Sequence, residues 1–425
     1  MTDDACSPTV YDTPAVELSF TPPQRVAVRN ADIKRLLYIR LDAIGDAVLA
    51  AGLLPSLRTV YPNAEIIAVC DHACAPVYAD ANYVDRIIEL PKNSLHTDEG
   101  FHTARRTLEA AGADLVLNFV RSNTPYTLAL SLLCGAPLLA VANNTSNMHP
   151  DNRNFLQNYV QTLIPLPDEL PEIEVYDRVL DFYGLKHEPC FPFMPVGDEA
   201  RAKATQLWSE TGFAPDKTIA AFAAAGVSCR DYPLLGAALA PVCKKYGFSV
   251  LTLGGKGHER EVNHMVVDAL RSHGIPALNL SGRLQLVEST ALLGACRLAV
   301  GVETSLAHIA CALSVPNVVV LGGGHFGRFM PYSPKTIAVC LPLECFNCEW
   351  RCPHPDTYCI SGVRPPAITQ AVRIALEQGD AGKSGRLLMQ GSVAKSQAQD
   401  MPRRQIPRKF ITSRRGRDLT VMTTR

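Results

Sequence analysis

The sequence predicts an α/β protein with two doubly wound domains in tandem. The chain has 425 residues, about two to three times the length of a typical domain, and 47% of them are hydrophobic, which is enough to bury sizeable cores. Short apolar runs alternate with stretches of helical periodicity, as in βαβ units with a parallel sheet. The alternation stops at a proline-containing stretch over residues 143–171 and then restarts.

Each half supplies its own series of strands and helices. In the first half, strands are predicted over residues 35–40, 65–70, 86–90 and 114–118, and helices over residues 46–61, 101–111, 124–134 and 172–183. In the second half, strands are predicted over residues 218–223, 249–253, 277–280, 298–301 and 317–321. The accompanying helices are predicted over residues 198–211, 234–246, 259–272, 284–295, 305–313 and 366–377.

The pattern divides the chain into four parts. These are a leader over residues 1–31, an N-terminal Rossmann-like domain over 32–190, a C-terminal Rossmann-like domain over 191–380, and a tail over 381–425. Doubly wound domains bind ligands at the carboxyl ends of their strands, so we expect the two domains to face each other across a cleft. The tail is polar with few periodic apolar residues, and it is predicted to be disordered.

The charge distribution gives no support for nucleic-acid binding and raises the question of lipid contact at the tail. The formal net charge is zero, so no global field favours nucleic acid. The tail, however, carries eleven Lys and Arg residues against Asp400 and Asp418. It is either simply solvated or in contact with anionic lipid headgroups, which would suit a membrane-anchored acceptor.

The sequence shows no targeting or membrane-spanning segment. Residues 1–30 include Asp3 and Asp4 and have no apolar core, so no signal peptide is expected. No apolar run reaches the ~18 residues that a membrane helix needs. We therefore expect a cytoplasmic location, with peripheral contact to the inner membrane if the basic tail binds lipid.

The first candidate site follows the first strand, over residues 40–46. Gly45 permits a tight turn, and Asp46 opens the next helix. The Asp46 carboxylate can cap that helix, or it can act as a general base toward an acceptor hydroxyl beyond the strand end. Asp42 is the competing carboxylate, and spacing alone does not choose between the two.

Two loops of the second half have the composition of phosphate-binding or nucleotide-binding turns. After the strand over residues 218–223, Gly226 and Ser228 would let backbone N–H groups approach a phosphate, and Arg230 could neutralise a diphosphate. The alternative is a surface loop with a solvated arginine. The next Gly-rich turn leads to Glu259, which could accept hydrogen bonds from ribose hydroxyls, although the dinucleotide-binding spacing is absent.

A third loop joins the strand over residues 298–301 to a helix. Thr304 and Ser305 suit the start of that helix, where free backbone N–H groups bind anions. Glu303 could hold sugar hydroxyls. His308 lies on the helix and is either a donor-binding residue or a hydrogen-bonded core histidine.

Four cysteines lie within fifteen residues near the end of the second domain, at positions 345, 348, 352 and 359. The cluster begins with a C-x-x-C pair, Cys345 and Cys348, and continues with Cys352 and Cys359. This pattern is typical of a metal finger. Four thiolates would hold structural zinc or iron in a closed site. Free thiols or a disulfide pair are the alternatives.

Several segments resemble glycosyltransferase family 9, the heptosyltransferase family. They are residues 38–49, 280–288, 300–310 and 322–332, and the resemblance extends over residues 34–376. It implies the GT-B type of fold with two facing Rossmann-like domains, sugar transfer with inversion, and no catalytic metal. It also implies that the sugar is heptose from ADP-heptose and that the acceptor is of the lipopolysaccharide type or another surface glycan.

The resemblance also implies residue roles. Asp46 becomes the general base, and the donor-binding residues become Gly226, Ser228, Arg230, Glu259, Glu303, Thr304, Ser305 and His308. Arg230 stands where the family usually has lysine, Glu303 where aspartate is commoner, and Ser305 where glycine is frequent. The phosphate loop lacks the hydroxyl residues of some members, so backbone N–H groups would bind the phosphates.

The cysteines also resemble the iron-binding finger of bacterial autotransporter heptosyltransferases. Those proteins have a longer N-terminal extension, so a protein acceptor is not carried over. Two other functions share the architecture with a glycosyltransferase: a nucleotide-sugar epimerase, which needs several acid/base residues around one sugar, and a non-catalytic protein that binds nucleotide-sugars.

Overall fold

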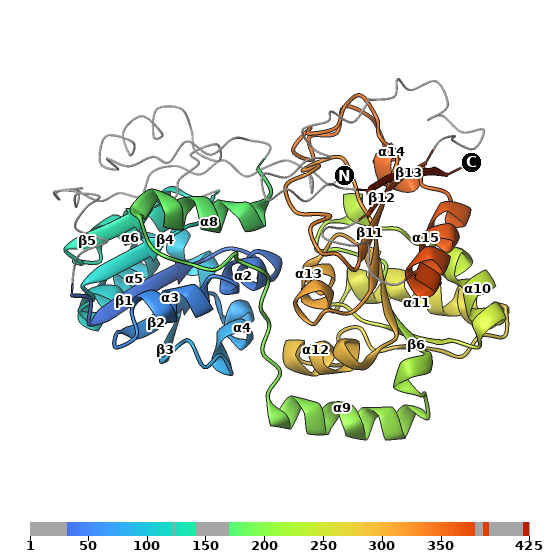
Figure 1. Cartoon of the computed structure of the whole chain (residues 1–425), viewed down its shortest axis with the longest axis horizontal. Helices are drawn as coiled ribbons and strands as arrows, with labels where there is room; N and C mark the ends of the chain where they lie inside the picture. The colour runs from blue at the N-terminus through green and yellow to red at the C-terminus, as the bar shows by residue number, and fades with distance from the viewer. Residues whose placement is uncertain (1–31, 122–123, 142–169, 379–385, 391–419, 425) are drawn as a thin grey trace. The chain divides into compact units, whose positions relative to one another are not determined.

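The chain folds into two compact units (Figure 1). The computed structural model describes residues 32–121, 124–141, 170–378, 386–390 and 420–424. The first unit ends at Pro195 and the second begins at Val196, so the boundary follows residue 195 rather than residue 190 as predicted. The predicted leader lies outside the described residues.

The N-terminal unit is built on a parallel sheet with the strand order β3-β2-β1-β4-β5. Its strands are β1 (Arg35–Arg40), β2 (Glu65–Cys70), β3 (Arg86–Glu89), β4 (Leu115–Asn118) and β5 (Leu138–Val141). Only the first residue of β1 and of β2 is partly exposed, as expected for strands covered on both faces. The strand order reverses between β1 and β4, which is where doubly wound sheets bind ligands.

Helices cover both faces of this sheet. They are α2 (Ile44–Ala51), α3 (Leu54–Val60), α4 (Pro76–Ala79), α5 (Asp98–Ala111), α6 (Pro125–Leu133) and α8 (Glu172–Tyr183), with short 3-10 turns η1 (His72–Cys74) and η2 (Lys92–His96). Helices α5 and α6 pack together, and Phe101 and Leu108 of α5 join the core formed by Leu37, Ile67 and Val116 of the sheet. Helix α2 packs against α4 and α8.

The helix predicted over residues 46–61 is in fact two helices, α2 and α3. Gly52 lies at the break, where the returning chain passes very close. A Cβ on Gly52 would lie 1.9 Å from the carbonyl oxygen of Phe191, and Phe193 donates its N–H to the carbonyl of Val48 at 3.1 Å. This approach involves residues about 140 positions away, so local periodicity could not predict it.

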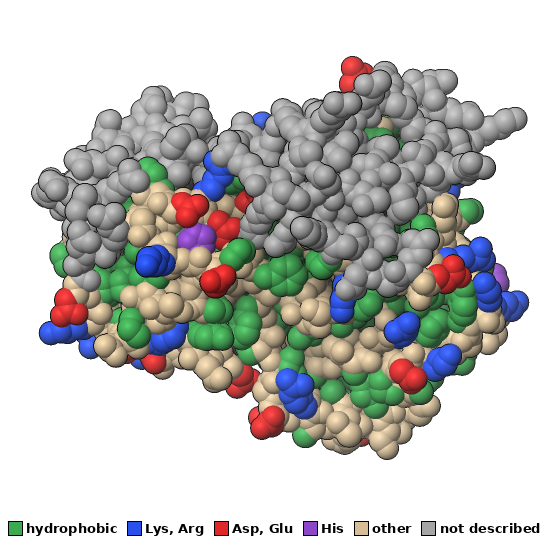
Figure 2. Space-filling model, in the orientation of Figure 1, with side chains coloured by type: hydrophobic (Ala, Val, Ile, Leu, Met, Phe, Trp, Pro, Cys, Tyr) green, Lys and Arg blue, Asp and Glu red, His purple; other side chains and the backbone are tan. Residues whose placement is uncertain are grey.

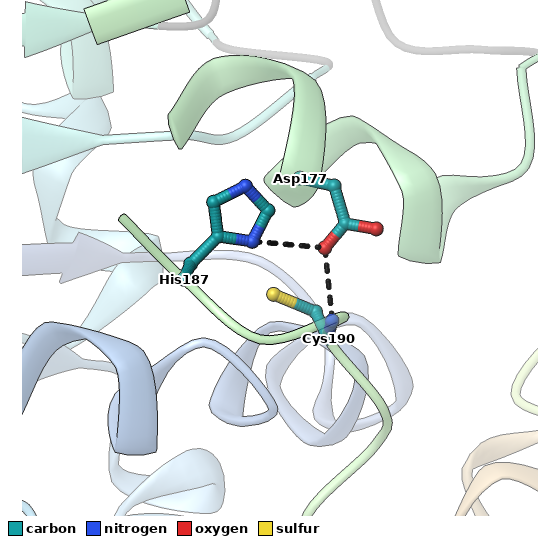
Figure 3. A group of neighbouring side chains, drawn as sticks. All are labelled: Asp177, His187 and Cys190. Carbon is teal, nitrogen blue, oxygen red and sulfur yellow. Dashed lines mark hydrogen bonds and ion pairs between the residues drawn. The ribbon is translucent and has the colours of Figure 1, made fainter. Parts of the chain in front are cut away.

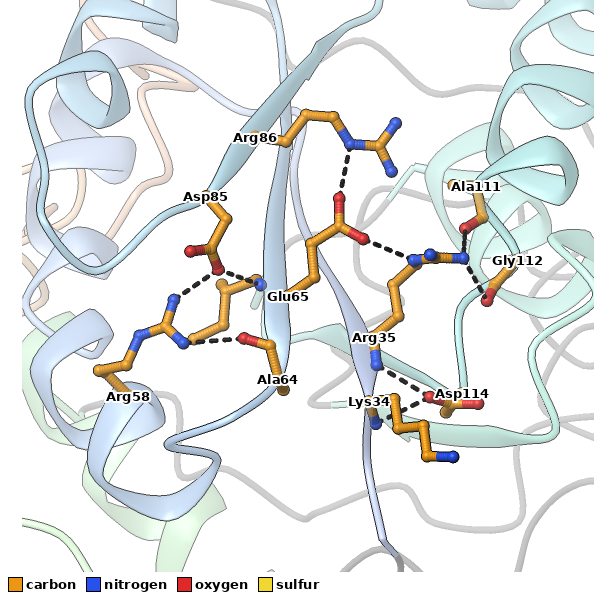
Figure 4. A network of polar contacts seen from close by, with 11 residues as sticks. Lys34, Arg35, Arg58, Ala64, Glu65, Asp85, Arg86, Ala111, Gly112 and Asp114 are labelled. Atoms are coloured by element: carbon orange, nitrogen blue, oxygen red, sulfur yellow. Dashed lines mark hydrogen bonds and ion pairs between the residues drawn. The ribbon is translucent and has the colours of Figure 1, made fainter.

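A polar network joins the amino ends of the strands (Figure 4). Arg35 of β1 and Arg86 of β3 donate to the two carboxylate oxygens of Glu65 on β2, at 2.6 and 2.9 Å. These hydrogen bonds hold the pKa of Glu65 below its usual value. Asp114 accepts the backbone N–H groups of Lys34 and Arg35. The network therefore braces the edge of the sheet opposite to the one where ligands are expected.

The C-terminal unit contains an eight-stranded sheet ordered β13-β12-β11-β10-β9-β6-β7-β8, and its ladders are parallel. Its strands are β6 (Thr218–Phe222), β7 (Ser249–Thr252), β8 (Ala277–Asn279), β9 (Leu298–Val302), β10 (Asn317–Val320), β11 (Thr336–Cys340), β12 (Arg386–Gln390) and β13 (Thr420–Thr424). The order reverses between β6 and β9, so the loops after these two strands flank the expected ligand position.

The helices of this unit form two groups. They are α9 (Asp198–Thr211), α10 (Leu235–Tyr246), α11 (His258–Ser272), α12 (Leu286–Ala295), α13 (Ser305–Ala312), α14 (Tyr358–Ser361) and α15 (Pro365–Gln378), with 3-10 turns η3 (Pro215–Lys217) and η4 (Ser228–Arg230). Helix α10 packs against α11 and α15, and α12 packs against α9 and α13 (Figure 1).

The prediction of a disordered tail is wrong for two segments. Strand β12 pairs with β11, and β13 pairs with β12, both in parallel register. The sheet edge at β11 offers unpaired backbone groups, and main-chain hydrogen bonds to that edge stabilise short segments regardless of side-chain periodicity. Strand β11 itself was not predicted, because the region after residue 321 is dominated by glycine, proline and cysteine. The rest of the tail lies outside the described residues.

Candidate functional site

In the N-terminal unit, buried charges gather where β1 ends. Arg40, the last residue of β1, is fully buried, and its guanidinium donates to the carboxylate of Asp42. Burial raises the pKa of Asp42 to about 7; the Arg40 charge opposes this rise and the Asp46 charge adds to it. Arg40 Nε and Nη1 and Asp42 Oδ1 are buried without a hydrogen-bond partner among the described residues. The described residues therefore satisfy the charge at this site only in part.

Asp46 lies in the first turn of α2, directly after this pair. It is partly exposed, whereas the five helix residues that follow it are buried. Ala43 is the N-cap of α2, and it offers no side-chain cap. A carboxylate in the first turn of a helix is stabilised in its charged form by the helix dipole. The two carboxylates named by the sequence thus differ in position: Asp42 is bound to a buried arginine in the loop after β1, and Asp46 lies in the first turn of α2.

The buried charges continue beneath α8. Arg40 also lies 3.4 Å from the hydroxyl of Tyr176, which donates to Glu172 at 3.3 Å. Glu172 lies 4.0 Å from Arg121, which follows β4. The chain of contacts therefore crosses the point between β1 and β4 where the strand order reverses. Sequence reasoning missed these residues; the only available signal was an arginine that ends an apolar strand.

In the C-terminal unit, the loop after β6 presents the predicted phosphate-binding residues. Gly226 and Ser228 are exposed, and a Cβ on Gly226 would meet nothing within 4 Å, so space is open around its backbone. Asp231 folds the loop by accepting the N–H of Ala225 at 3.0 Å, and it is hydrogen-bonded to His258. Arg230 is half-buried, and its Nε has no partner among the described residues.

Glu259 stabilises the glycine-rich turn that precedes it. Its carboxylate accepts the N–H of Gly255 at 2.8 Å. A Cβ on Gly254 would approach Glu259 and Asn263 to 3.0 Å, and the φ of Gly254 is +158°, so this turn requires glycine. The predicted contact of Glu259 with ribose would have to use lone pairs that this hydrogen bond leaves available.

The loop after β9 brings Glu303, Thr304 and Ser305 to the same edge of the sheet. Glu303 is buried, and Ser305 begins α13. Thr304 is the N-cap of α13, but its side chain makes no capping hydrogen bond. The buried Oγ1 of Thr304 has no partner among the described residues. An N-cap threonine whose hydroxyl is not used for capping is available to a ligand.

His308 has the features of the core-histidine alternative. It is buried on α13, its Nδ1 lies 3.1 Å from the hydroxyl of Tyr332, and the two rings are stacked at 6.0 Å. Phe329 lies 6.1 Å from the same imidazole. The structure therefore shows a hydrogen-bonded, packed histidine at this position.

The four cysteines converge on one small cavity. Cys345, Cys348, Cys352 and Cys359 line it together with Trp350 and His354. Burial raises the pKa of Cys359 to about 12 and raises the pKa of Cys345 and Cys348 as well. The four sulfurs lie too far apart to bind one metal ion as they stand. Among the described residues, only Asp177, His187 and Cys190 bring three potential ligand atoms within 4.8 Å of one another.

The cysteine loop has an unusual backbone and is held against the segment after β10. Asn347, Glu349 and Trp350 have positive φ values of 69°, 54° and 63°, which non-glycine residues adopt only where the surroundings enforce them. Asn347 and Glu349 donate to the carbonyls of Gly323 and Gly324 at 2.7 and 2.9 Å. The N–H of Gly323 in turn donates to Cys359 Sγ at 3.3 Å.

Trp350 connects this loop to the loop after β6. The Arg230 guanidinium lies over the Trp350 ring, 5.2 Å from its centroid. Trp350 is buried, and its indole N–H donates to His325 at 3.2 Å. A Cβ on Gly324 would lie 2.3 Å from the indole, so a glycine is needed there for the ring to fit. The loop after β6 and the cysteine loop, more than a hundred residues apart in sequence, are therefore in contact through Arg230 and Trp350.

The described surface and helices give two further observations. On the face drawn in Figure 2, Lys and Arg side chains are scattered among acidic and hydrophobic ones. Among the residues that the structure describes, no helix combines the length and the apolar character needed to cross a membrane.

Comparisons with known proteins agree with this geometry. Residues 175–354 match the model of glycosyltransferase family 9 (heptosyltransferase). The chain is 22% identical to lipooligosaccharide heptosyltransferase 2 of Haemophilus ducreyi over 302 residues, which cover 67% of this chain and 82% of that protein.

Solved structures agree with the fold. A family 9 glycosyltransferase from Veillonella parvula superposes with a TM-score of 0.71 at 19% identity, over 81% of this chain and 98% of that one. The E. coli heptosyltransferase WaaC with ADP-2-deoxy-2-fluoro heptose superposes with a TM-score of 0.57 at 15% identity, over 80% of this chain and 99% of that one.

Two parallel, doubly wound units give the GT-B type of fold, which the superposed glycosyltransferase structures share. The family model, the curated relatives and the solved structures all point the same way. The chain is similar to glycosyltransferase family 9, the heptosyltransferase family, whose model matches residues 175–354.

Proposed function

We propose that this glycosyltransferase transfers heptose from ADP-heptose to a lipopolysaccharide-type or other surface glycan, with inversion and without a catalytic metal. The curated relatives are named as heptosyltransferases, and the WaaC structure carries an ADP-heptose analogue. The residues of the C-terminal unit are consistent with such a donor.

The observation that carries the proposal is a pair of buried polar atoms without partners in the described chain. The two atoms are Nε of Arg230, in the loop after β6, and Oγ1 of Thr304, in the loop after β9. Strands β6 and β9 are neighbours in the sheet, and the strand order reverses between them. An N–H donor on a cation and a hydroxyl at a helix start are both suited to a diphosphate. Burying polar atoms without partners is costly, so a ligand that supplies partners would bind favourably there.

Asp46 is proposed as the general base in preference to Asp42. Arg40 donates to one oxygen of the Asp42 carboxylate and the other oxygen is buried, so an acceptor hydroxyl reaches Asp42 less easily than it reaches the first turn of α2. Asp46 follows on the first turn of α2 and is partly exposed. Asp42 and Arg40 would then act by setting the electrostatic field around Asp46.

The proposed reaction needs few groups. Asp46 takes the proton of the acceptor hydroxyl as that oxygen forms a bond to the anomeric carbon of the donor. The bond between that carbon and the diphosphate oxygen breaks, and its electron pair leaves with the nucleotide. Arg230 and the start of α13 stabilise the charge on the departing diphosphate.

Release of nucleotide from a panel of ADP-sugars and UDP-sugars tests the proposal, with and without lipopolysaccharide acceptor. We expect ADP release from ADP-heptose that depends on acceptor and is lost in Asp46→Asn. Conversion of the donor sugar without acceptor would instead indicate an epimerase. Tight binding of ADP-heptose without any turnover would indicate a binding protein.

We also propose that the four cysteines hold a structural zinc or iron ion. Support comes from the thiol set itself, from the shared cavity and from the backbone N–H of Gly323 that faces Cys359. The side chains would have to turn toward one another to bind it. Cys348→Ser should lower the metal content by about one ion per chain, and the buried cysteine variant Cys243→Ser should leave it unchanged. Equal metal content in both variants would contradict the proposal.

Contact of the basic tail with anionic headgroups is a further part of the proposal. It is supported by the excess of basic residues over residues 381–425. We expect co-sedimentation with phosphatidylglycerol vesicles, weaker binding to phosphatidylcholine vesicles, and loss of the difference when Arg403 and Arg404 are changed to glutamate.

A further inference from the structure

The loop that follows α8 folds back along that helix. Gly184 ends α8 in the left-handed conformation, with φ 68°, and Leu185 donates its N–H to the carbonyl of Leu180 at 2.9 Å. Further on, Cys190 donates its N–H to Asp177 Oδ1 at 2.8 Å. The turn thereby brings the side chains of Asp177, His187 and Cys190 together (Figure 3).

The distances among these side chains suit a shared cation. One ligand atom from each of Asp177, His187 and Cys190 lies within 4.8 Å of the other two. His187 Nδ1 lies 3.7 Å from Asp177 Oδ1, which is too long for a hydrogen bond. Bonds of about 2.0–2.3 Å to a tetrahedral ion place its ligands about 3.3–3.8 Å apart.

The second nitrogen of the imidazole has the partner that metal-bound histidines usually have. His187 Nε2 lies 3.1 Å from Asp181 Oδ1. A carboxylate at this position favours the proton on Nε2 and leaves the lone pair of Nδ1 directed toward Asp177. The carbonyl oxygen of Glu188 lies 3.1 Å from the same Nδ1 and would supply an additional oxygen ligand. In Figure 3 the sulfur of Cys190 points toward His187.

The site is largely closed to solvent. Cys190 is 1% exposed, and the side chains of His187 and Asp177 are 10% and 14% exposed. One sulfur, one nitrogen and one carboxylate oxygen are the ligand types that zinc accepts in proteins. We propose that Asp177, His187 and Cys190 form a zinc site, with Asp181 orienting the histidine.

The site would hold in place the chain that supports α2. Residues 191–193 follow Cys190 directly, and there Phe191 packs against Gly52 and Phe193 bonds to Val48 of α2. Helix α8 also packs against α2. Zinc would therefore fasten the helix that carries Asp46 to its neighbours without taking part in sugar transfer.

One alternative explains the same contacts without a metal. His187 would then be held only by hydrogen bonds, through Nε2 to Asp181 and through Nδ1 to the carbonyl of Glu188. The two possibilities differ in one measurable respect, since only the first predicts zinc bound to this segment.

Zinc content and zinc affinity of the full chain test the proposal, after removal of metal by a chelator and reloading with zinc alone. We expect Cys190→Ser and His187→Gln each to lose about one zinc per chain, including in the Cys348→Ser background, and Cys243→Ser to lose none. Asp181→Asn keeps all three ligands, and we expect it to weaken zinc binding about 10–100-fold while the protein stays folded. Cobalt in the site should show the sulfur-to-metal absorption of a single thiolate, which Cys190→Ser abolishes.

Asp181→Asn keeps the test decisive if the ligand variants do not fold. Unchanged zinc content in Cys190→Ser and unchanged zinc affinity in Asp181→Asn would overturn the proposal in favour of a histidine clip. Zinc loss in Cys348→Ser alone would also overturn it, because the metal would then belong to the cysteine cluster.

Discussion

The two units place very different residues at equivalent points of their sheets. In the N-terminal unit, β1 runs into Arg40, Asp42 and Asp46, of which the first is fully buried. In the C-terminal unit, β6 runs into three buried alanines and an exposed glycine, with Arg230 as the nearby cation. Both positions lie where the strand order reverses, so the architecture provides the place in each case.

The difference follows from what each site is proposed to do. Proton transfer needs a carboxylate whose charge is tuned by burial and by neighbouring charges. Binding a diphosphate needs backbone N–H groups that can approach closely and a cation that stays charged. Four substitutions test this contrast.

Asp46→Asn should lower the rate of transfer about 10²–10⁴-fold, because it removes the proposed base. Binding of ADP should be unchanged, since the nucleotide is assigned to the other unit. Steady-state transfer and calorimetric ADP titration measure the two quantities. Asp71→Asn, at the end of β2, is the matched control and should stay active. A fully active Asp46→Asn enzyme would mean that the base is another group.

Arg230→Ala should lower kcat/KM for the donor about 10–100-fold. A hydrogen bond from a charged group contributes about 1.5–3 kcal/mol, and about 1.4 kcal/mol corresponds to a factor of ten. Lys256→Ala removes an exposed cation from the next loop and should have little effect. If both variants lose the same activity, general charge rather than a directed contact explains the result.

Trp350→Ala should weaken donor binding about 3–10-fold through loss of the ring beneath Arg230. Trp350→Phe should retain most of the affinity, because a phenyl ring keeps part of the stacking. The effect of Trp350→Ala should largely vanish in an Arg230→Ala background. Donor KM values for the four combinations form a double-mutant cycle, and strictly additive losses would show that the two residues act independently.

Asp42 should give the protein a pH-dependent stability. Burial raises its pKa to about 7 from 3.8, so the folded state holds this proton more tightly than the unfolded state. The contribution to stability is therefore complete below about pH 4 and is lost as the pH rises through about 7. Arg40 and Lys92 oppose the shift, and Asp46 and Glu172 add to it.

Asp42→Asn should remove this dependence. We expect its urea unfolding midpoint to fall less than that of the wild type between about pH 5 and pH 8. The informative quantity is the slope of the urea midpoint against pH, because loss of the partner of Arg40 changes stability at every pH. Parallel pH profiles of the two proteins would contradict the shifted pKa.

Local patterns in the sequence were sufficient for most of the fold. Apolar runs predicted β1 and β6, and the glycine and carboxylate positions predicted the loops that follow them. Positions 46, 230 and 304 were all named from such loops, because the carboxyl ends of parallel strands share one edge of a sheet. Strands β12 and β13 escaped prediction because they are stabilised by a neighbouring strand rather than by their own periodicity.

The order of the elements and the loops that carry chemistry therefore follow from local sequence patterns. The tertiary structure alone decided which distant side chains meet: Arg230 with Trp350, Arg40 with Tyr176, and Asp177 with His187 and Cys190. The physical reason is that helix and strand periods are encoded within a few residues. Contacts across tens of residues depend on how closely the assembled elements pack, as at Gly52 and Gly324.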